Sequence, residues 1–302
     1  MIDSAVLRRV PTLLGSTPFT APLKDGALSP SLFTFAIADM AVAQNGFKPL
    51  VRDGAFDIAE CAIVTLLQAK AYGKPLVLLP FVVNGMFHHG SIVYNARNGE
   101  LTPKGLEGKR VGIRSYTQTT PTWVRGFLAA DEGVDLERVR WVTFEDAHLE
   151  EFHDPSGVER AAPGKKLAAM LVAGEIDAAF MGQEQPEAFH LRRLYPDPAA
   201  AAAQWYEKHR VVPINHMLAV SERLARSRPD IVRETFDLFT AARRLRQPAG
   251  GPAGADLAPI GLAKIRPALE LVIDYAFAQR LIPRRLRVDE LFDETTAILG
   301  AA

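Results

Sequence analysis

Strand-length apolar runs alternate with helix-length segments along most of the chain, and this alternation constrains the fold more than any other feature. Strands are predicted over residues 11–15, 56–60, 76–83, 91–95, 109–114, 141–145, 176–181 and 211–220. Helices are predicted over residues 62–72, 120–132, 164–175, 198–209, 230–245, 259–280 and 289–299. Such alternation favours parallel sheets with helices packed on their faces. The predicted fold class is therefore α/β.

Length and charge narrow the class of protein further. A chain of 302 residues with 48% hydrophobic content can bury one large core or two moderate ones, and two lobes are favoured. Its 35 basic and 35 acidic residues cancel, so no bulk field favours nucleic acid or an anionic membrane. No apolar run approaches the roughly 20 residues of a spanning helix, and the N-terminus lacks the apolar core of a signal peptide. We expect a soluble, cytoplasmic protein with a small-molecule partner.

Residues 106–128 read as a strand, a hydroxyl-rich turn and the start of a helix. Thr119 or Thr120 can cap this helix, with Pro121 in its first turn. Free backbone N–H groups at a helix start, together with the helix dipole, favour a carboxylate or phosphate by ~0.3–1 kcal/mol. The segment is therefore either an anion-binding site or only a well-capped helix. The turn would contribute Arg114, Ser115, Thr117, Gln118, Thr119 and Thr120 to ligand binding.

One glutamate and three histidines are further candidates for a reactive site. Glu60 directly follows an apolar strand, where it is either an exposed strand-end carboxylate or a member of a site. His88 and His89 are adjacent, so on an extended strand only one of them can enter a shared cleft. His216 lies in an apolar strand, where burying an unpaired imidazole costs about 1–3 kcal/mol. His216 therefore needs a partner, either the backbone or a ligand.

The remaining candidates carry weaker signals. Trp123, near the predicted helix start, either belongs to the core or stacks on an aromatic ring. The other histidines lie in polar or helical contexts and are expected to be solvated: His148, His153, His190 and His209. No metal site is predicted, because these histidines have no carboxylates at helical spacing. The single cysteine, Cys61, excludes an internal disulfide and is expected to be buried.

Six segments of the chain resemble a known family. They are residues 54–60, 87–94, 106–128, 167–180, 191–196 and 213–216, and they are similar to 4,5-dihydroxyphthalate decarboxylases. That family has the type 2 periplasmic-binding-protein-like fold. The resemblance implies two lobes joined by two crossing strands, near residues 91–95 and 211–219, with a ligand cleft between them. Lobe one would hold residues 1–95 and 213–302, including the C-terminal helices, and lobe two residues 96–212.

The resemblance also implies a reaction. It predicts a cofactor-independent carbon–carbon lyase that protonates the ring carbon bearing a carboxylate on a hydroxylated aromatic acid and releases CO2. Glu60 would accept a phenolic proton or hold a base, and His89 or His216 would donate the proton. The turn 114–120 would orient the carboxylate. A homo-oligomer is expected on the resemblance alone.

The chain departs from the family at positions that set charge. His88 stands where the family tends to have arginine, and Glu184, a predicted substrate-binding residue, would repel a second anion. Arg114 adds a cation where the family's turn is acidic or neutral. We therefore expect a related but differently charged substrate. Two alternatives stay open: a solute-binding protein for a small carboxylate linked to ABC-type transport, and an enzyme of cofactor or quinone synthesis on the same scaffold.

Overall fold

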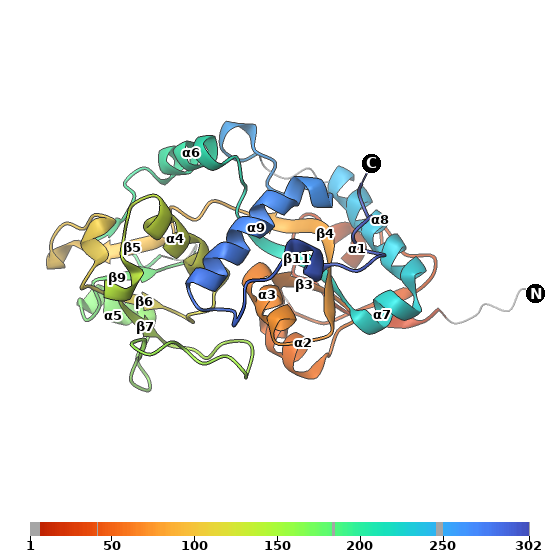
Figure 1. Cartoon of the computed structure of the whole chain (residues 1–302), viewed down its shortest axis with the longest axis horizontal. Coiled ribbons are helices and arrows are strands. Elements are labelled where there is room, and N and C mark those ends of the chain that lie inside the picture. The colour runs from red at the N-terminus through yellow and green to blue at the C-terminus, as the bar shows by residue number, and fades with distance from the viewer. Residues whose placement is uncertain (1–6, 41, 183–184, 246–249, 302) are drawn as a thin grey trace, which may run out of the picture.

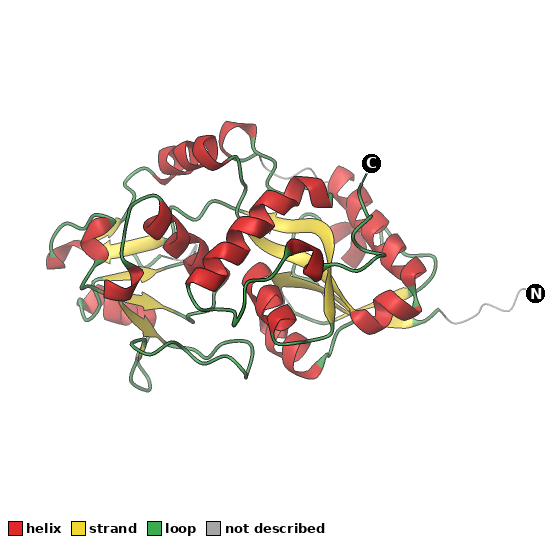
Figure 2. Cartoon of the chain, viewed as in Figure 1, coloured by secondary structure: helices red, strands yellow, loops and turns green. Residues whose placement is uncertain are grey.

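The structure is a computed structural model that describes residues 7–40, 42–182, 185–245 and 250–301. It contains two sheets that lie side by side along the long axis of the molecule (Figure 1). Helices lie on both faces of each sheet (Figure 2). The predicted α/β class is therefore confirmed.

The first sheet has the strand order β2-β1-β3-β11-β4. Strands β1 and β3 are parallel, whereas β11 runs antiparallel to both β3 and β4. The strands of this sheet are β1 (Arg9–Leu13), β2 (Thr34–Ile37), β3 (Ile58–Ala62), β4 (Leu76–Gly85) and β11 (Ile214–Ser221).

The second sheet has the order β10-β5-β9-β6-β7-β8. Strand β6 is parallel to β7 and β9, and β5 is antiparallel to β9 and β10. Its strands are β5 (Ile92–Asn95), β6 (Arg110–Ile113), β7 (Arg140–Thr143), β8 (Glu159–Arg160), β9 (Ala178–Phe180) and β10 (Leu191–Arg193). Both sheets are thus mixed rather than parallel throughout, because β5 and β11, which follow the two crossings between the sheets, run against their neighbours.

The helices are α1 (Ala21–Lys24), α2 (Phe47–Asp53), α3 (Ile63–Ala71), α4 (Thr119–Ala130), α5 (Leu167–Ala173), α6 (Pro198–His209), α7 (Glu222–Ser227), α8 (Pro229–Leu245) and α9 (Leu262–Ala278). The predicted helix over residues 289–299 is wrong. Its place is taken by a 3-10 turn at Val288–Leu291 and by further turns. The side chains of Asp293 and Thr296 each accept a hydrogen bond from the other's backbone N–H, and such local bonds compete with a helix.

The chain changes sheet between Gly85, the last residue of β4, and Ile92, the first of β5. It returns between α6 and β11. Strand β5 therefore belongs to the second sheet, although the sequence placed residues 1–95 in lobe one. The exact division into two lobes stays a prediction.

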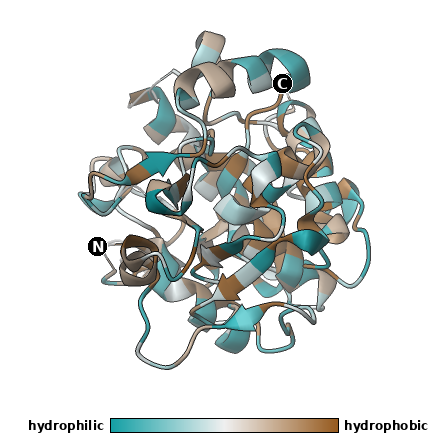
Figure 3. Ribbon diagram, turned by 90° about the vertical axis from the view of Figure 1, so that its left-hand side faces the viewer, coloured by the Kyte–Doolittle hydropathy of each residue, from teal (hydrophilic) through white to brown (hydrophobic). Residues whose placement is uncertain are grey.

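One apolar core joins the two halves. A single cluster of buried side chains includes Leu13 and Val64 beside the first sheet and Val111 and Phe127 beside the second. Helix α9 lies between the sheets and packs against α4 and α3 (Figure 1). Figure 3 shows hydrophobic segments among the interior strands and hydrophilic ones on outer loops. No helix in the described ranges is long and apolar enough to cross a membrane.

The contact between α4 and α9 depends on a glycine. A Cβ atom at Gly126 would lie 2.1 Å from the ring of Tyr275, so only glycine permits this approach. Gln279 Nε2, just after α9, donates a hydrogen bond of 2.8 Å to the Thr122 carbonyl of α4. These contacts fix the N-terminal end of α4 relative to the first sheet.

Candidate functional site

A cavity of about 790 Å³ opens between the two sheets. Phe47, Thr65 and His216 line it from the side of the first sheet, and Arg114 and His148 line it from the side of the second. Its volume lies within the range of small-molecule sites, roughly 300–1,000 Å³. This cavity is the candidate functional site.

Two helices begin at the cavity. Ala62 precedes α3, Thr119 begins α4, and both line the cavity. Neither N-cap side chain closes its own helix; instead Thr119 Oγ1 accepts a hydrogen bond of 3.3 Å from the Val64 backbone N–H. The predicted capping of α4 by Thr119 is thus wrong, because this hydroxyl joins the two helix starts. The remaining N–H groups and both dipoles favour an anion between them.

Arg114 and Gln118 stand next to this anion-favouring region. The Gln118 side-chain oxygen accepts hydrogen bonds from Arg114 Nε and Nη2, at 3.1 and 3.0 Å, when its amide is turned toward the guanidinium. Arg114 Nε lies 3.4 Å from Glu145 Oε2. Among the described lining residues, Arg114 alone has a formal charge. Arg114 therefore supplies the positive formal charge of the described cavity wall, and Glu145 partly offsets it.

Glu60 and His216 form a buried pair at the cavity wall. Glu60 pairs with Leu218 across β3 and β11, so its side chain shares a face with His216, its diagonal neighbour. Glu60 Oε1 lies 2.7 Å from His216 Nδ1, and Oε2 accepts a hydrogen bond of 3.0 Å from the Gly15 N–H. The side chains are 4% and 7% exposed, respectively, so solvent does not compete for these bonds.

This pair has the geometry of an oriented acid–base group. His216 lines the cavity, and its Nε2 makes no hydrogen bond to a described residue. A carboxylate on Nδ1 fixes the orientation and the tautomer of the ring. The partner that the sequence required for His216 is therefore Glu60. Of the two predicted roles of Glu60, the geometry favours holding a base, because Glu60 does not line the cavity.

His148 is a member of the site that the sequence missed. Its Nδ1 lies 2.8 Å from Thr65 Oγ1, and its ring packs edge-on against Phe47, with centroids 5.5 Å apart. Phe47 makes the same contact with His216, again at 5.5 Å. The expectation that His148 is solvated was wrong. It follows β7, so the rule that ligands bind beyond the carboxyl ends of strands would have included it.

His148 is held neutral. Burial, and to a smaller extent the nearby cations of Arg114, Lys48 and Arg52, together lower its pKa from 6.5 to about 4. Near pH 7 its imidazole is an uncharged hydrogen-bonding group.

Some predicted substrate-binding residues do not reach the cavity. Ser115 and Thr117 are buried in the turn, their hydroxyls 3.4 Å apart. Trp123 is fully buried and donates a hydrogen bond of 2.8 Å to the Ile214 carbonyl, so it joins α4 to β11 rather than stacking on a ligand. By contrast, Arg114, Gln118, Thr119 and Thr120 all line the cavity. Glu184 lies outside the described residues.

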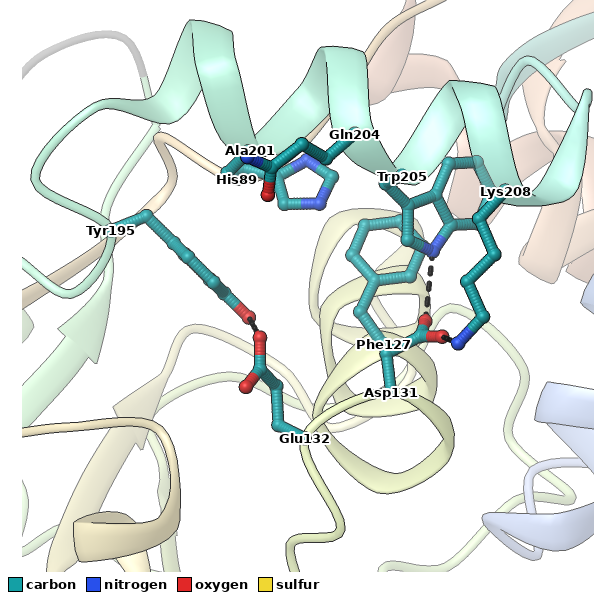
Figure 4. A pocket seen from close by; sticks show the side chains of 9 residues that line it. All are labelled: His89, Phe127, Asp131, Glu132, Tyr195, Ala201, Gln204, Trp205 and Lys208. Carbon is teal, nitrogen blue, oxygen red and sulfur yellow. Dashed lines mark hydrogen bonds and ion pairs between the residues drawn. The ribbon is translucent and has the colours of Figure 1, made fainter.

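His89 lies in a different cavity, of about 240 Å³ (Figure 4). Its ring stacks on Phe127 at 4.8 Å, and Trp205 of α6 lines the same space. Burial is the main cause that lowers the pKa of His89 to about 4. His88 does not line the large cavity either, because residues 86–91 carry the chain across to the second sheet. The structure thus does not bring His89 to His216.

The remaining candidates are a metal site, the cysteine and three histidines. In the described ranges, no three histidine, cysteine, aspartate or glutamate side chains gather as a metal site. Cys61 is buried, and burial raises the pKa of its thiol. His190 is buried and His209 is bonded to Asp131, so the expectation that these two histidines are solvated is wrong. His153 is exposed, as expected.

The chain is similar to two curated proteins named 4,5-dihydroxyphthalate decarboxylase. The one from Comamonas testosteroni is 33% identical over 191 residues, which is 59% of this chain and 58% of that protein. The one from Pseudomonas putida is 33% identical over 168 residues, 51% of this chain and 65% of that protein. The matches thus span less than two thirds of either relative's length. No family model matches the chain.

A solved structure gives the fold. The periplasmic aliphatic sulphonate binding protein SsuA from Escherichia coli aligns with a TM-score of 0.59 at 13% identity, over 96% of this chain and 93% of that one. At this identity the likeness concerns the fold alone. It confirms the predicted two-lobed, periplasmic-binding-protein-like architecture, and the curated relatives confirm the resemblance seen in the sequence.

Proposed function

We propose that this chain is a decarboxylase of a hydroxylated aromatic carboxylate and that His216 donates the proton to the ring. The observation that carries the proposal is the position of the Glu60–His216 pair at the same cavity as two helix starts and Arg114. The named activity of the two curated relatives supports the reaction class.

The residues divide the chemistry between them. The helix starts and Arg114 orient the carboxylate, and the edge of the cavity at Phe47 contacts the ring. Protonated His216 Nε2 gives its proton to the ring carbon that bears the carboxylate, while Glu60 stabilises the imidazolium. The carbon–carbon bond then breaks, its electron pair returns to the ring, and CO2 leaves. One proton is consumed for each CO2, and no cofactor takes part in these steps.

The charge of the site bears on the substrate. Arg114 is one cation, and bidentate binding of a second carboxylate calls for another. A hydroxylated aromatic acid with a single carboxylate fits the described wall better than a dicarboxylate. We retain the sequence-based view that the substrate is related to 4,5-dihydroxyphthalate but differently charged. The cytoplasmic location and the homo-oligomeric state stay predictions.

The test is CO2 release from a panel of hydroxybenzoates and hydroxyphthalates, with thermal unfolding of the protein measured in parallel. The proposal predicts a member that both stabilises the protein and loses CO2. A ligand that raises the melting temperature and is recovered intact would instead favour a solute-binding protein. A solute-binding protein is the alternative to be tested, because the fold is similar to that of a sulphonate binding protein.

A further inference from the structure

We infer that His148 and Thr65 form a subsite for a ring oxygen of the substrate, and that this subsite binds the oxygen as a phenolate. The inference rests on the proposed function, because the proposed decarboxylation needs a group that holds the ring oxygen. No role for either residue follows from the sequence. The subsite lies on the same cavity as His216, with Phe47 between the two imidazoles.

The hydrogen bond between His148 and Thr65 sets the direction of the imidazole. Their Nδ1 and Oγ1 atoms are 2.8 Å apart, and the Thr65 hydroxyl makes no other hydrogen bond to a described residue. When this hydroxyl donates to Nδ1, the ring hydrogen is on Nε2. Nε2 makes no hydrogen bond to a described residue, and it is not among the enclosed, unpartnered atoms of the described side chains. In that tautomer His148 offers an N–H donor to a ligand.

The surrounding charges select a negative oxygen. Lys48, Arg52 and Arg114 all act on His148, and they disfavour its protonation. The same positive field stabilises an oxyanion bonded to Nε2–H. Of the facing carboxylates, Glu150 is paired with Arg52 at 2.8 Å, and Glu145 lies 3.4 Å from Arg114. A neutral hydrogen-bond donor surrounded by cations therefore binds a phenolate oxygen better than it binds a neutral hydroxyl group.

The loop that carries His148 is fixed to the first sheet's side. Arg52 of α2 donates through Nε to the His148 carbonyl at 2.7 Å and through Nη2 to the Ala147 carbonyl at 3.1 Å. This contact positions the imidazole without using a side chain of the cavity. The subsite is thus built from α2, α3 and the segment after β7.

A phenolate para to the carboxylate is the form that the proposed reaction needs. Its charge raises the electron density on the carbon that bears the carboxylate. That carbon forms a C–H bond with the proton from His216, and the oxygen becomes a carbonyl. The C–C bond to CO2 breaks, and its electron pair restores the aromatic ring and the phenolate. The inferred substrate class is an aromatic acid with a hydroxyl para to the carboxylate that is lost.

The experiment uses 4-hydroxy-3-nitrobenzoate, whose phenol and phenolate forms absorb at different wavelengths. Its absorbance is titrated against pH, free and bound to saturation. We expect the pKa of the bound phenol to be lower than that of the free probe by about one unit, a tenfold change in proton affinity. His148→Phe, which keeps a ring beside Phe47, should abolish the shift, and Thr65→Val should reduce it. His153→Phe, an exposed histidine five residues along, is the matched control and should keep it.

The outcomes separate the inference from the proposed function. A probe that does not bind, or a bound pKa that is unchanged or equally lowered in His148→Phe, would overturn the subsite. CO2 release from the hydroxybenzoate panel with that result would leave the proposed function standing. A lowered pKa that depends on His148, with no CO2 release from any member of the panel, would support the subsite and refute the reaction. Thermal unfolding of both variants checks that each is folded.

Discussion

Replacing Glu60 by glutamine should stop turnover while leaving the fold nearly intact. The carboxylate serves two partners: it accepts the Gly15 N–H at 3.0 Å and lies 2.7 Å from His216 Nδ1. A glutamine side chain has one oxygen, so the amide that keeps Gly15 bonded turns its NH2 toward Nδ1. That NH2 donates to Nδ1 and so favours the His216 tautomer with its hydrogen on Nε2. The variant also has no carboxylate at this position to stabilise the imidazolium.

The magnitude follows from the loss of this orientation and charge. A positioned general acid contributes about 10²–10⁴-fold, and a wrong histidine tautomer in a comparable pair of a serine protease costs about 10⁴-fold. We expect kcat for Glu60→Gln to fall by about 10²–10⁴-fold. The unfolding free energy should drop by only ~1–3 kcal/mol, since one buried hydrogen bond is weakened.

The assay is the initial rate of CO2 release at saturating substrate, with ligand binding followed by thermal shift. Asp57→Asn is the matched control, because Asp57 is a buried carboxylate just before β3 that bonds Ser221 and Arg223 away from the cavity. The control should lose stability but keep kcat. A Glu60→Gln protein that is folded, binds ligand and turns over within about threefold of the wild type would refute the reasoning.

Three other changes give separate tests. His216→Gln should lower kcat at least about 10²-fold, whereas His89→Gln should keep kcat, because His89 lies in the other cavity; equal losses in steady-state assays would contradict this. Trp123→Phe removes the hydrogen bond to the Ile214 carbonyl and should lower the unfolding free energy by about 1–3 kcal/mol. Urea denaturation measures this loss, and an unchanged unfolding free energy would contradict the expectation. Burial lowers the pKa of His88 to about 3 and that of His89 to about 4, so the unfolded chain binds more protons below pH 6.5, and stability should fall as the pH is lowered from 7 toward 4. Urea midpoints that stay constant over that range would contradict the last expectation.

The sequence predicted the elements that depend on strong local patterns. The helix over residues 198–209 has the bounds that were predicted, and the apolar run from Leu76 forms β4. The short elements β2 and α2 were missed. Their strand and helix patterns are too brief for periodicity to show. Helix α2 ends at Asp53 and is followed by Gly54, whose positive φ of 62° closes the helix.

The part of the site that depends on a local sequence signal was predicted, and the part that depends on long-range strand pairing was not. A hydroxyl-rich turn before a helix is a local signal, so Arg114, Gln118 and Thr119 were found. The pairing of Glu60 with His216 depends on the register of β3 against β11, which joins residues 156 positions apart. His89 was placed in the site by resemblance alone, and the path of the crossing segment takes it elsewhere.

The most direct test of the account is to run the reaction in D2O with an aromatic acid that carries a hydroxyl para to its carboxylate, and to examine the product by proton NMR. Proton donation by His216 to the ring predicts one deuterium in the product, at the carbon from which CO2 was lost. A ligand recovered unchanged after binding, or deuterium at other ring positions with the carboxylate retained, would contradict the account.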